Sequence, residues 1–235
     1  MDLFTKQWAT YRSVVEHDLM DHQALTVATA VALDSWFEHQ ASWSVLPNLV
    51  DLGCGDLSQL APLLRRLSLG SYTGVDLADA VLPMAASNLE PVPYPTHWQC
   101  ADLLGWILTA PASESIDLLH SAFAIHHLSD DQKKLFLTNA RQIINDKGLF
   151  IWIDVFREPG ELQADYLSRY CHRIERSWQP LCSDQKQLVI NHIREFDLPP
   201  DRQLIKAFAE ANGWHWQWAW RGSHAAEAMA ILTPS

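Results

Sequence analysis

The residues best suited to chemistry lie in a glycine-rich segment, residues 50–56, which reads Val-Asp-Leu-Gly-Cys-Gly-Asp. A short apolar run precedes it and a helical pattern follows it. Glycine lets the backbone take positive φ and approach a ligand closely, and the next helix N-terminus offers unpaired amides to an anionic group. The segment therefore indicates a ligand-binding turn, with an ordinary tight connection or a nicotinamide or flavin site as alternatives.

Three acidic residues follow the same pattern at successive strand ends. Asp51 ends the first predicted strand, Asp76 ends the second, and Asp102 follows the third. A carboxylate at the second strand end can accept hydrogen bonds from ribose hydroxyls, and one after the third can accept from an adenine amine. A single such acid is more often a helix cap. Three acidic residues at successive strand ends favour a nucleoside-binding site.

The elements that must position these residues alternate along the chain. Predicted strands cover residues 49–52, 72–75, 96–100, 116–122 and 149–156, and predicted helices cover residues 58–67, 78–89 and 129–145. Such alternation predicts βαβ units around a parallel sheet.

The alternation stops after the fifth strand. Residues 161–178, 184–196 and 201–212 have helical patterns, and residues 214–220 and 226–232 have strand patterns. Only a short connection separates the last two strands, so this pair is predicted to be antiparallel. Residues 1–40 are predicted to be helical, with a break near Asp21 and His22.

On these motifs the chain resembles the class I S-adenosylmethionine-dependent methyltransferases, in their small-molecule branch. Residues 51–55, 74–77 and 100–103 are similar to the family's first three motifs. Residues 121–128 resemble the segment after the fourth strand, and residues 145–150 resemble the turn before the fifth. The chain departs from the family at Leu57, where a third glycine is usual, and at Lys147-Gly148, where a glycine pair is usual.

The resemblance implies a fold and a cofactor. The expected fold is α/β and Rossmann-like: a single domain with a mostly parallel seven-stranded sheet, an antiparallel C-terminal strand, a helical cap over residues 1–40 and a helical lid over residues 157–198. The expected cofactor is S-adenosylmethionine, with S-adenosylhomocysteine as product. The resemblance implies that the methionine part is surrounded by Asp51, Gly53, Cys54 and Gly55, and that the ribose is held by Asp76 and Leu77. It further implies that the adenine meets Asp102 and Leu103, and that Ser121 and Phe123 lie near the sulfonium.

Histidine is the side chain best poised to act as a base near neutral pH. His126 follows the fourth strand, whereas His22 and His192 belong to the predicted cap and lid. We expect one of these three to contact the methyl acceptor, and we interpret His127 as structural.

Aromatic residues in the cap and lid are candidates for substrate contact. Tyr166 and Tyr170 lie one turn apart on a predicted helix and can line a pocket together, and Tyr11 is a third candidate in the cap. The alternative is that these rings only pack the lid onto the sheet. Trp214, Trp216, Trp218 and Trp220 are predicted to point to one face of their strand, either in packing or in a homodimer contact, and packing is preferred.

The composition limits which binding partners and locations are expected. The net charge is −11 and the pI about 5.3, which disfavours nucleic acid. The four cysteines form neither a disulfide framework nor a zinc pattern, so no metal site is expected. No signal peptide or membrane-spanning run is visible, and a cytoplasmic location is expected.

The predicted function is methyl transfer to oxygen or nitrogen of a small-molecule acceptor, by in-line displacement under the lid. One alternative is a nicotinamide-dependent oxidoreductase, which Asp51, Asp102 and the antiparallel C-terminal pair disfavour. The other is a non-catalytic binding protein on the same fold.

Overall fold

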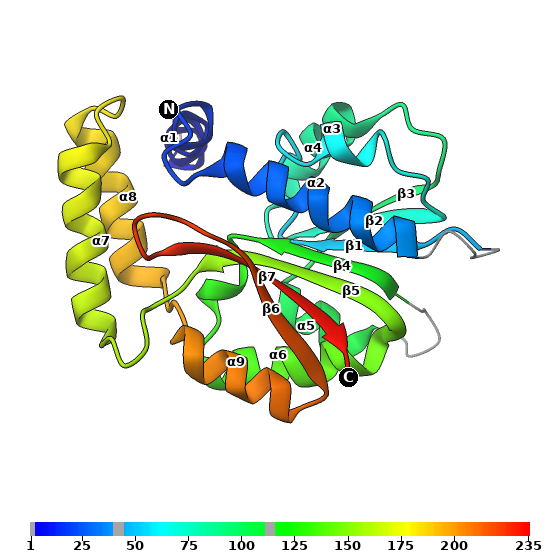
Figure 1. Cartoon of the computed structure of the whole chain (residues 1–235). Helices are drawn as coiled ribbons and strands as arrows, with labels where there is room; N and C mark the ends of the chain where they lie inside the picture. The colour runs from blue at the N-terminus through cyan, green and yellow to red at the C-terminus, as the bar shows by residue number, and fades with distance from the viewer. Residues whose placement is uncertain (1–2, 40–44, 111–115) are drawn as a thin grey trace.

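Seven strands form one sheet in the order β3-β2-β1-β4-β5-β7-β6 (Figure 1). The computed structural model describes residues 3–39, 45–110 and 116–235. The strands are β1 (Asn48–Leu52), β2 (Ser71–Asp76), β3 (Thr96–Cys100), β4 (Ile116–Ala122), β5 (Ile144–Val155), β6 (Trp214–Arg221) and β7 (Glu227–Pro234). Strands β1 to β5 pair in parallel, and β7 is antiparallel to both β5 and β6. The predicted fold class is confirmed.

Helices cover both faces of the sheet. The helices and short 3-10 turns between β1 and β5 are α3 (Ala61–Leu64), η1 (Asp79–Val81), α4 (Leu82–Leu89), α5 (Leu103–Thr109), η2 (Ile125–His127) and α6 (Asp130–Ile143). Helices α2 (His22–His39), α3 and α4 cover one face, while α5, α6 and α9 (Arg202–Ala211) cover the other (Figure 1). Each face buries its own apolar cluster, so the sheet is sandwiched between two cores.

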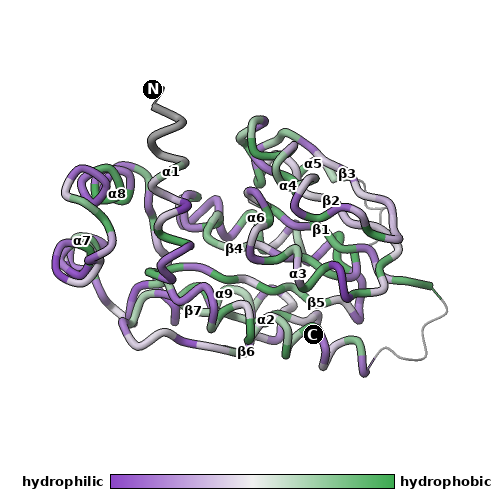
Figure 2. Tube along the Cα trace, turned by 90° about the horizontal axis from the view of Figure 1, so that it is seen from above, coloured by the Kyte–Doolittle hydropathy of each residue, from purple (hydrophilic) through white to green (hydrophobic). Residues whose placement is uncertain are grey.

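A third group of helices stands at one end of the sheet. Helices α7 (Gln163–Ser177) and α8 (Ser183–Phe196) lie side by side at the same end as α1 (Leu3–Glu16), as Figure 2 shows. Their shared cluster includes Val14 of α1, Tyr170 and Ile174 of α7 and Ile193 of α8, and it reaches Val155 at the carboxyl end of β5. The predicted cap and lid segments therefore meet here. Residues 1, 2 and 40 of the predicted cap lie outside the described residues.

Some element boundaries differ from the predictions. The helix expected at residues 58–67 is only the single turn α3, because Leu57 takes a positive φ and the helix starts only at Ala61, with Pro62 in its first turn. Helix α5 was not predicted from the sequence. Strand β5 begins at Ile144, directly after α6, so the expected turn at Lys147-Gly148 lies inside the strand. Gly148 permits this because a Cβ there would lie 3.0 Å from the backbone oxygen of Asp117.

The prediction that four tryptophans share one face of β6 is wrong for the last of them. Trp214, Trp216 and Trp218 pack into the cluster under α6 and α9, whereas Trp220 packs on the α2 side. The pairing with β7 shifts between Trp218 and Trp220. The extra residue, Ala219, is a β-bulge that reverses the alternation.

None of the helices among the described residues is long and apolar enough to cross a membrane.

The two faces of β6 give a stability prediction. Trp216 is buried and contacts Trp152 at a centroid distance of 5.6 Å, so Trp216→Ala should lower the free energy of unfolding by about 3–5 kcal/mol. The matched change Trp220→Ala, at a half-buried position, should cost clearly less. Urea unfolding of the two variants measures this, and equal losses would contradict the assignment of the faces.

Candidate active site

The glycine-rich turn joins β1 to α3 with three residues in the left-handed region. Gly53 has φ +76°, Gly55 has φ +53°, and Leu57 has φ +60°. Leu57 therefore takes the conformation for which glycine is best suited, at the place where the family usually has glycine. Its side chain is buried in the α2 core cluster, which offsets a backbone cost of about 1–2 kcal/mol.

The two glycines of the turn serve different needs. A Cβ on Gly53 would lie 2.4 Å from the Cβ of Ala124, so this glycine lets the segment after β4 pack directly against the turn. A Cβ on Gly55 would have no atom within 4 Å. Gly55 therefore faces open space, as a backbone that a ligand approaches requires.

Asp76 at the end of β2 ties its strand to the turn. Its Oδ2 accepts a hydrogen bond from the Gly55 amide at 2.9 Å, and its Oδ1 accepts one from the Ala78 amide at 2.9 Å. Burial raises the pKa of Asp76, and these two amide bonds oppose that rise only in part. The carboxylate thus lies beside the turn, at the position where a ribose is bound in such sheets.

The other residues expected to meet the nucleoside lie at the ends of β2 and β3. Leu77 is 74% exposed, which leaves a large apolar side chain free to cover a planar ring. Asp102 is exposed and caps α5, accepting from the Gly105 amide at 2.8 Å. Leu103, the first residue of that helix, packs partly against the core. The structure thus places all three at the carboxyl edge of the sheet.

A buried pair of polar residues lies behind the turn. Asp51 accepts hydrogen bonds from the Tyr72 hydroxyl at 3.0 Å and from His120 Nδ1 at 2.7 Å. Burial and the Asp51 charge raise the pKa of Tyr72, so its hydroxyl stays protonated and donates. The His120 Nε2 atom is buried, with no hydrogen-bond partner among the described residues. His120 was not among the site residues predicted from the sequence.

A small cavity of about 90 Å³, which we call the turn cavity, lies against these groups. Its lining includes Asp51, Gly53, Cys54, Gly55, His22 and His120. Burial raises the pKa of the Cys54 thiol and lowers that of His22, so both side chains are neutral. Ser121, expected near the sulfonium, is instead fully buried, and its hydroxyl donates to the Leu52 carbonyl at 2.8 Å.

Phe123 separates the turn cavity from a second one. It lines both cavities and has φ +52°, which is a strained conformation for an aromatic residue. The second cavity, which we call the lid cavity, has a volume of about 320 Å³ and lies under α1, α7 and α8. Phe123, like Tyr11, therefore borders both the space beside the glycine turn and the larger space beneath the lid.

Three histidines and two carboxylates gather at the edge of the lid cavity. His126 Nδ1 lies 2.5 Å from Asp154 Oδ1, and His126 Nε2 lies 3.5 Å from Asp197 Oδ1. The same Asp197 oxygen lies 3.7 Å from His127 Nδ1 and 3.9 Å from His192 Nε2. Two of the three predicted catalytic histidines, His126 and His192, thus converge on one carboxylate, whereas His22 lies at the turn cavity.

The carboxylates decide how the two adjacent histidines ionise. Burial alone would lower the pKa of His126, but the charges of Asp154 and Asp197 outweigh it and raise that pKa to about 10. Burial and the neighbouring His126 charge lower the pKa of His127 to about 4. At neutral pH His126 is therefore an imidazolium, and His127 is neutral and only weakly basic, so neither is a ready general base.

The tyrosines expected to contact substrate have different surroundings. Tyr11 and Tyr170 line the lid cavity, and the Tyr170 hydroxyl donates to Glu227 at 2.8 Å. Tyr166 is buried in the lid cluster, stacked on Tyr170 with a centroid distance of 5.5 Å. Its place favours a packing role.

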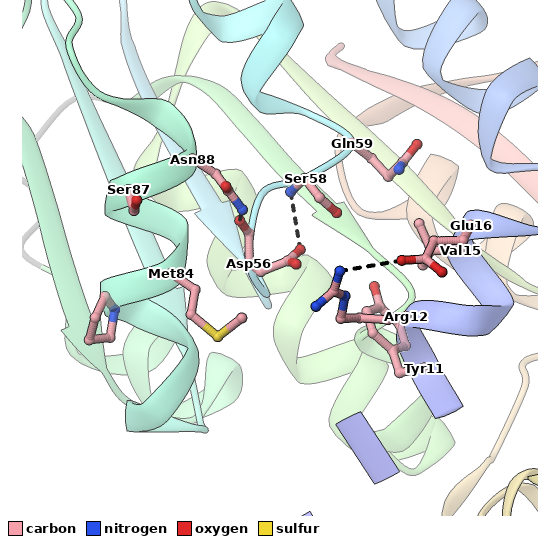
Figure 3. Close-up of a pocket in the computed structure, with 11 residues that line it drawn as sticks. Tyr11, Arg12, Val15, Glu16, Asp56, Ser58, Gln59, Met84, Ser87 and Asn88 are labelled. Atoms are coloured by element: carbon pink, nitrogen blue, oxygen red, sulfur yellow. Dashed lines mark hydrogen bonds and ion pairs between the residues drawn. The ribbon is translucent and has the colours of Figure 1, made fainter. Parts of the chain in front are cut away.

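A third cavity, of about 550 Å³, opens between α1, the glycine turn and α4 (Figure 3). Its wall mixes apolar side chains such as Val15 and Met84 with polar ones. Arg12 pairs with Glu16 at 3.3 Å, and Asn88 donates to the Asp56 carbonyl at 2.8 Å. Tyr11 lines this cavity and the other two, so α1 borders all of them.

Three site residues were missed because their signals are faint in the sequence. His120 and Asp154 are buried polar residues that each directly follow an apolar stretch of their strand, which is the one local sign that they are held by specific partners. Asp197 follows the second lid helix and joins the cluster only through the fold.

Comparison with known proteins agrees with this geometry. Residues 49–148 match the family model described as "Methyltransferase domain". No curated protein is similar enough in sequence to be matched.

Solved structures with the same fold are distant in sequence. The plantazolicin methyltransferase BpumL, in complex with a monoazolic desmethylPZN analog and SAH, has a TM-score of 0.64 at 12% sequence identity, and the match covers 95% of this chain and 89% of that one. Magnesium protoporphyrin IX methyltransferase from Synechocystis PCC 6803, with bound SAH, has a TM-score of 0.62 at 13% sequence identity, and the match covers 97% of this chain and 93% of that one. The YcgJ protein from Bacillus subtilis has a TM-score of 0.57 at 13% sequence identity, and the match covers 84% of this chain and 96% of that one.

The two glycines give a prediction that separates packing from backbone strain. Gly53→Ala adds both a positive-φ penalty and the contact with Ala124, so the free energy of unfolding should fall by about 2–4 kcal/mol. Gly55→Ala, the matched control, adds only the backbone penalty and should cost about 1 kcal/mol. Chemical denaturation measures both, and a loss at Gly55 as large as that at Gly53 would count against the close approach.

Proposed function

We propose that this chain is a class I S-adenosylmethionine-dependent methyltransferase and that it transfers a methyl group from S-adenosylmethionine to oxygen or nitrogen of a small molecule. The proposal is supported most by the pair of cavities that meet at Phe123. One touches the glycine turn expected to hold the methionine part of the cofactor. The other has room for an acceptor beneath the lid.

The chemistry needs alignment more than it needs reactive side chains. Methyl transfer from a sulfonium is an in-line displacement, in which the acceptor atom attacks the methyl carbon as the bond to sulfur breaks. Holding the two partners in line can supply a large part of the rate. In this proposal Phe123, which lines both cavities, flanks this line, and the apolar lid cluster helps to keep water away from it.

The acceptor is proposed to be small because the lid cavity has a volume of only about 320 Å³ and is lined by residues of α1, α7 and α8. Its lining mixes apolar residues, such as Val14, Met20 and Trp178, with the histidine cluster at one edge. This pattern suits a compound with an apolar body and one polar group that is presented to the histidines.

Calorimetric titration with S-adenosylmethionine, S-adenosylhomocysteine and NAD tests the cofactor. The first two should bind with micromolar affinity and NAD should not bind. Asp76→Ala should weaken S-adenosylhomocysteine binding by about 2 kcal/mol, roughly 30-fold, since charge-assisted hydrogen bonds are lost. Binding of NAD alone would favour an oxidoreductase, and binding of none of the three would favour a non-catalytic protein.

Asp76 also predicts a pH dependence. Only the ionised carboxylate can accept hydrogen bonds from both ribose hydroxyls, and its pKa is raised by burial. The affinity for S-adenosylhomocysteine should therefore be highest above this raised pKa and should fall as the pH drops through it. The fall should begin at a higher pH than it would for an aspartate with an ordinary pKa.

The control for this pH dependence is the variant Asp76→Asn. Its affinity for S-adenosylhomocysteine should be lower than that of wild type and should not change with pH in the same range. The measurement is a titration series at several pH values, with circular dichroism confirming that each sample is folded. If the wild-type affinity for S-adenosylhomocysteine stayed constant down to the pH at which an ordinary aspartate is protonated, the role of Asp76 would be contradicted.

A further inference from the structure

The cluster at the edge of the lid cavity has the composition and spacing of a metal site. One nitrogen each from His126 and His127 and one oxygen of Asp197 lie within 4.8 Å of one another. The nitrogens lie 3.5 and 3.7 Å from Asp197 Oδ1. Ligands at about 2.0–2.1 Å around a tetrahedral ion are separated by about 3.3 Å, so small side-chain movements would complete the site.

Asp197 provides a second, independent observation. Its side chain is only 9% exposed, and Oδ1 has no hydrogen-bond partner among the described residues. A buried carboxylate oxygen without a hydrogen bond is costly. It faces three imidazole rings, since His192 Nε2 also lies 3.9 Å away. A cation among these groups would satisfy the oxygen.

Asp154 orients the first ligand in the way that metal sites require. Its carboxylate accepts from His126 Nδ1 at 2.5 Å and from the His126 backbone amide at 3.0 Å. This bond keeps a proton on Nδ1, so Nε2, which lies 3.5 Å from Asp197 Oδ1, is the nitrogen that can bind a metal once its own proton is lost. A carboxylate behind a ligating histidine is the usual arrangement around bound transition metals.

The two segments that carry the ligands are joined by the chain itself. The Leu198 amide donates to the His126 carbonyl at 2.8 Å. The buried Lys133 ammonium donates to the carbonyls of Leu128 and Leu198. These bonds hold the turn after β4 against the end of α8, so the ligand atoms are preorganised.

Two features compete with a metal. His126 is an imidazolium at neutral pH, and its Nε2 proton would have to leave on binding because a ligating nitrogen is deprotonated. His127 Nδ1 lies 3.3 Å from the Phe196 carbonyl, and as a ligand it would carry no proton and would give up this bond. The contact is long and lies on the half-exposed side of the cluster, so its loss costs little compared with a coordinate bond.

We propose that His126 Nε2, His127 Nδ1 and Asp197 Oδ1 bind one divalent first-row transition-metal ion, whose open position faces the lid cavity. Two imidazoles and a carboxylate suit zinc, cobalt or iron(II). Bound there, the ion would act as a Lewis acid on the acceptor's oxygen or nitrogen, as in a phenol or a carboxylic acid, and would favour its deprotonated form. This role rests on the proposed function, whereas metal binding itself does not.

The test is titration of untagged, chelator-stripped full-length protein with Co²⁺ and Zn²⁺, followed by calorimetry and by the visible absorption of cobalt. Wild type should bind one ion per chain with an absorption typical of low coordination. His127→Ala and Asp197→Asn should each weaken binding by at least about 100-fold, and Asp154→Asn by about 10–100-fold. His215→Ala, at an exposed histidine on β6, is the matched control and should bind like wild type.

Stoichiometric binding that is lost in the two ligand variants supports the site. Folded wild type that binds no cobalt, or ligand variants that keep wild-type affinity, would overturn it. His127 is half-exposed, so its variant should fold even if Asp197→Asn does not. Each sample is also titrated with S-adenosylhomocysteine: cofactor binding without metal binding removes only the metal site, and metal binding without cofactor binding removes only the proposed function.

Discussion

A single buried charge organises the end of the sheet where the candidate site lies. Asp154, on β5, is completely shielded from solvent and accepts four hydrogen bonds, from the His126 amide and ring, the Trp152 indole and the Val155 amide. A carboxylate without these donors would be very costly in an apolar core. The turn after β4 must therefore fold back over β5, and this requirement brings His126 to the lid cavity and holds Asp197 opposite.

A second constraint is the close approach of two turns. Because Gly53 has no side chain, Ala124 packs directly on the glycine turn, and Phe123 is held between the two cavities with a strained backbone. The cofactor side and the acceptor side of the site are thus positioned by the same contact. Strain at such a residue persists only where surrounding packing fixes it.

Local patterns were enough to predict the sheet, and they failed where geometry depends on distant residues. The alternation of strands and helices and the acids at strand ends predicted the fold and the positions of Asp51, Asp76 and Asp102. The reversal of Trp220 could not be predicted, because the bulge at Ala219 depends on pairing with β7. The cluster around Asp197 was invisible for a similar reason: His126 and His127 are adjacent in sequence, but their carboxylate partners lie on β5 and after α8. Ser121 has the type and place of a cofactor contact, yet its hydroxyl satisfies a strand carbonyl instead.

The position of α1 has a thermodynamic consequence. Tyr11 forms part of the wall of all three cavities, so a ligand that shifts this helix when it fills one cavity also changes the walls of the others. Linkage then makes the effect reciprocal: if the first ligand strengthens binding of the second by some factor, the second strengthens the first by the same factor. Cooperativity between donor and acceptor would in that case originate in one N-terminal helix rather than in any contact between the two molecules.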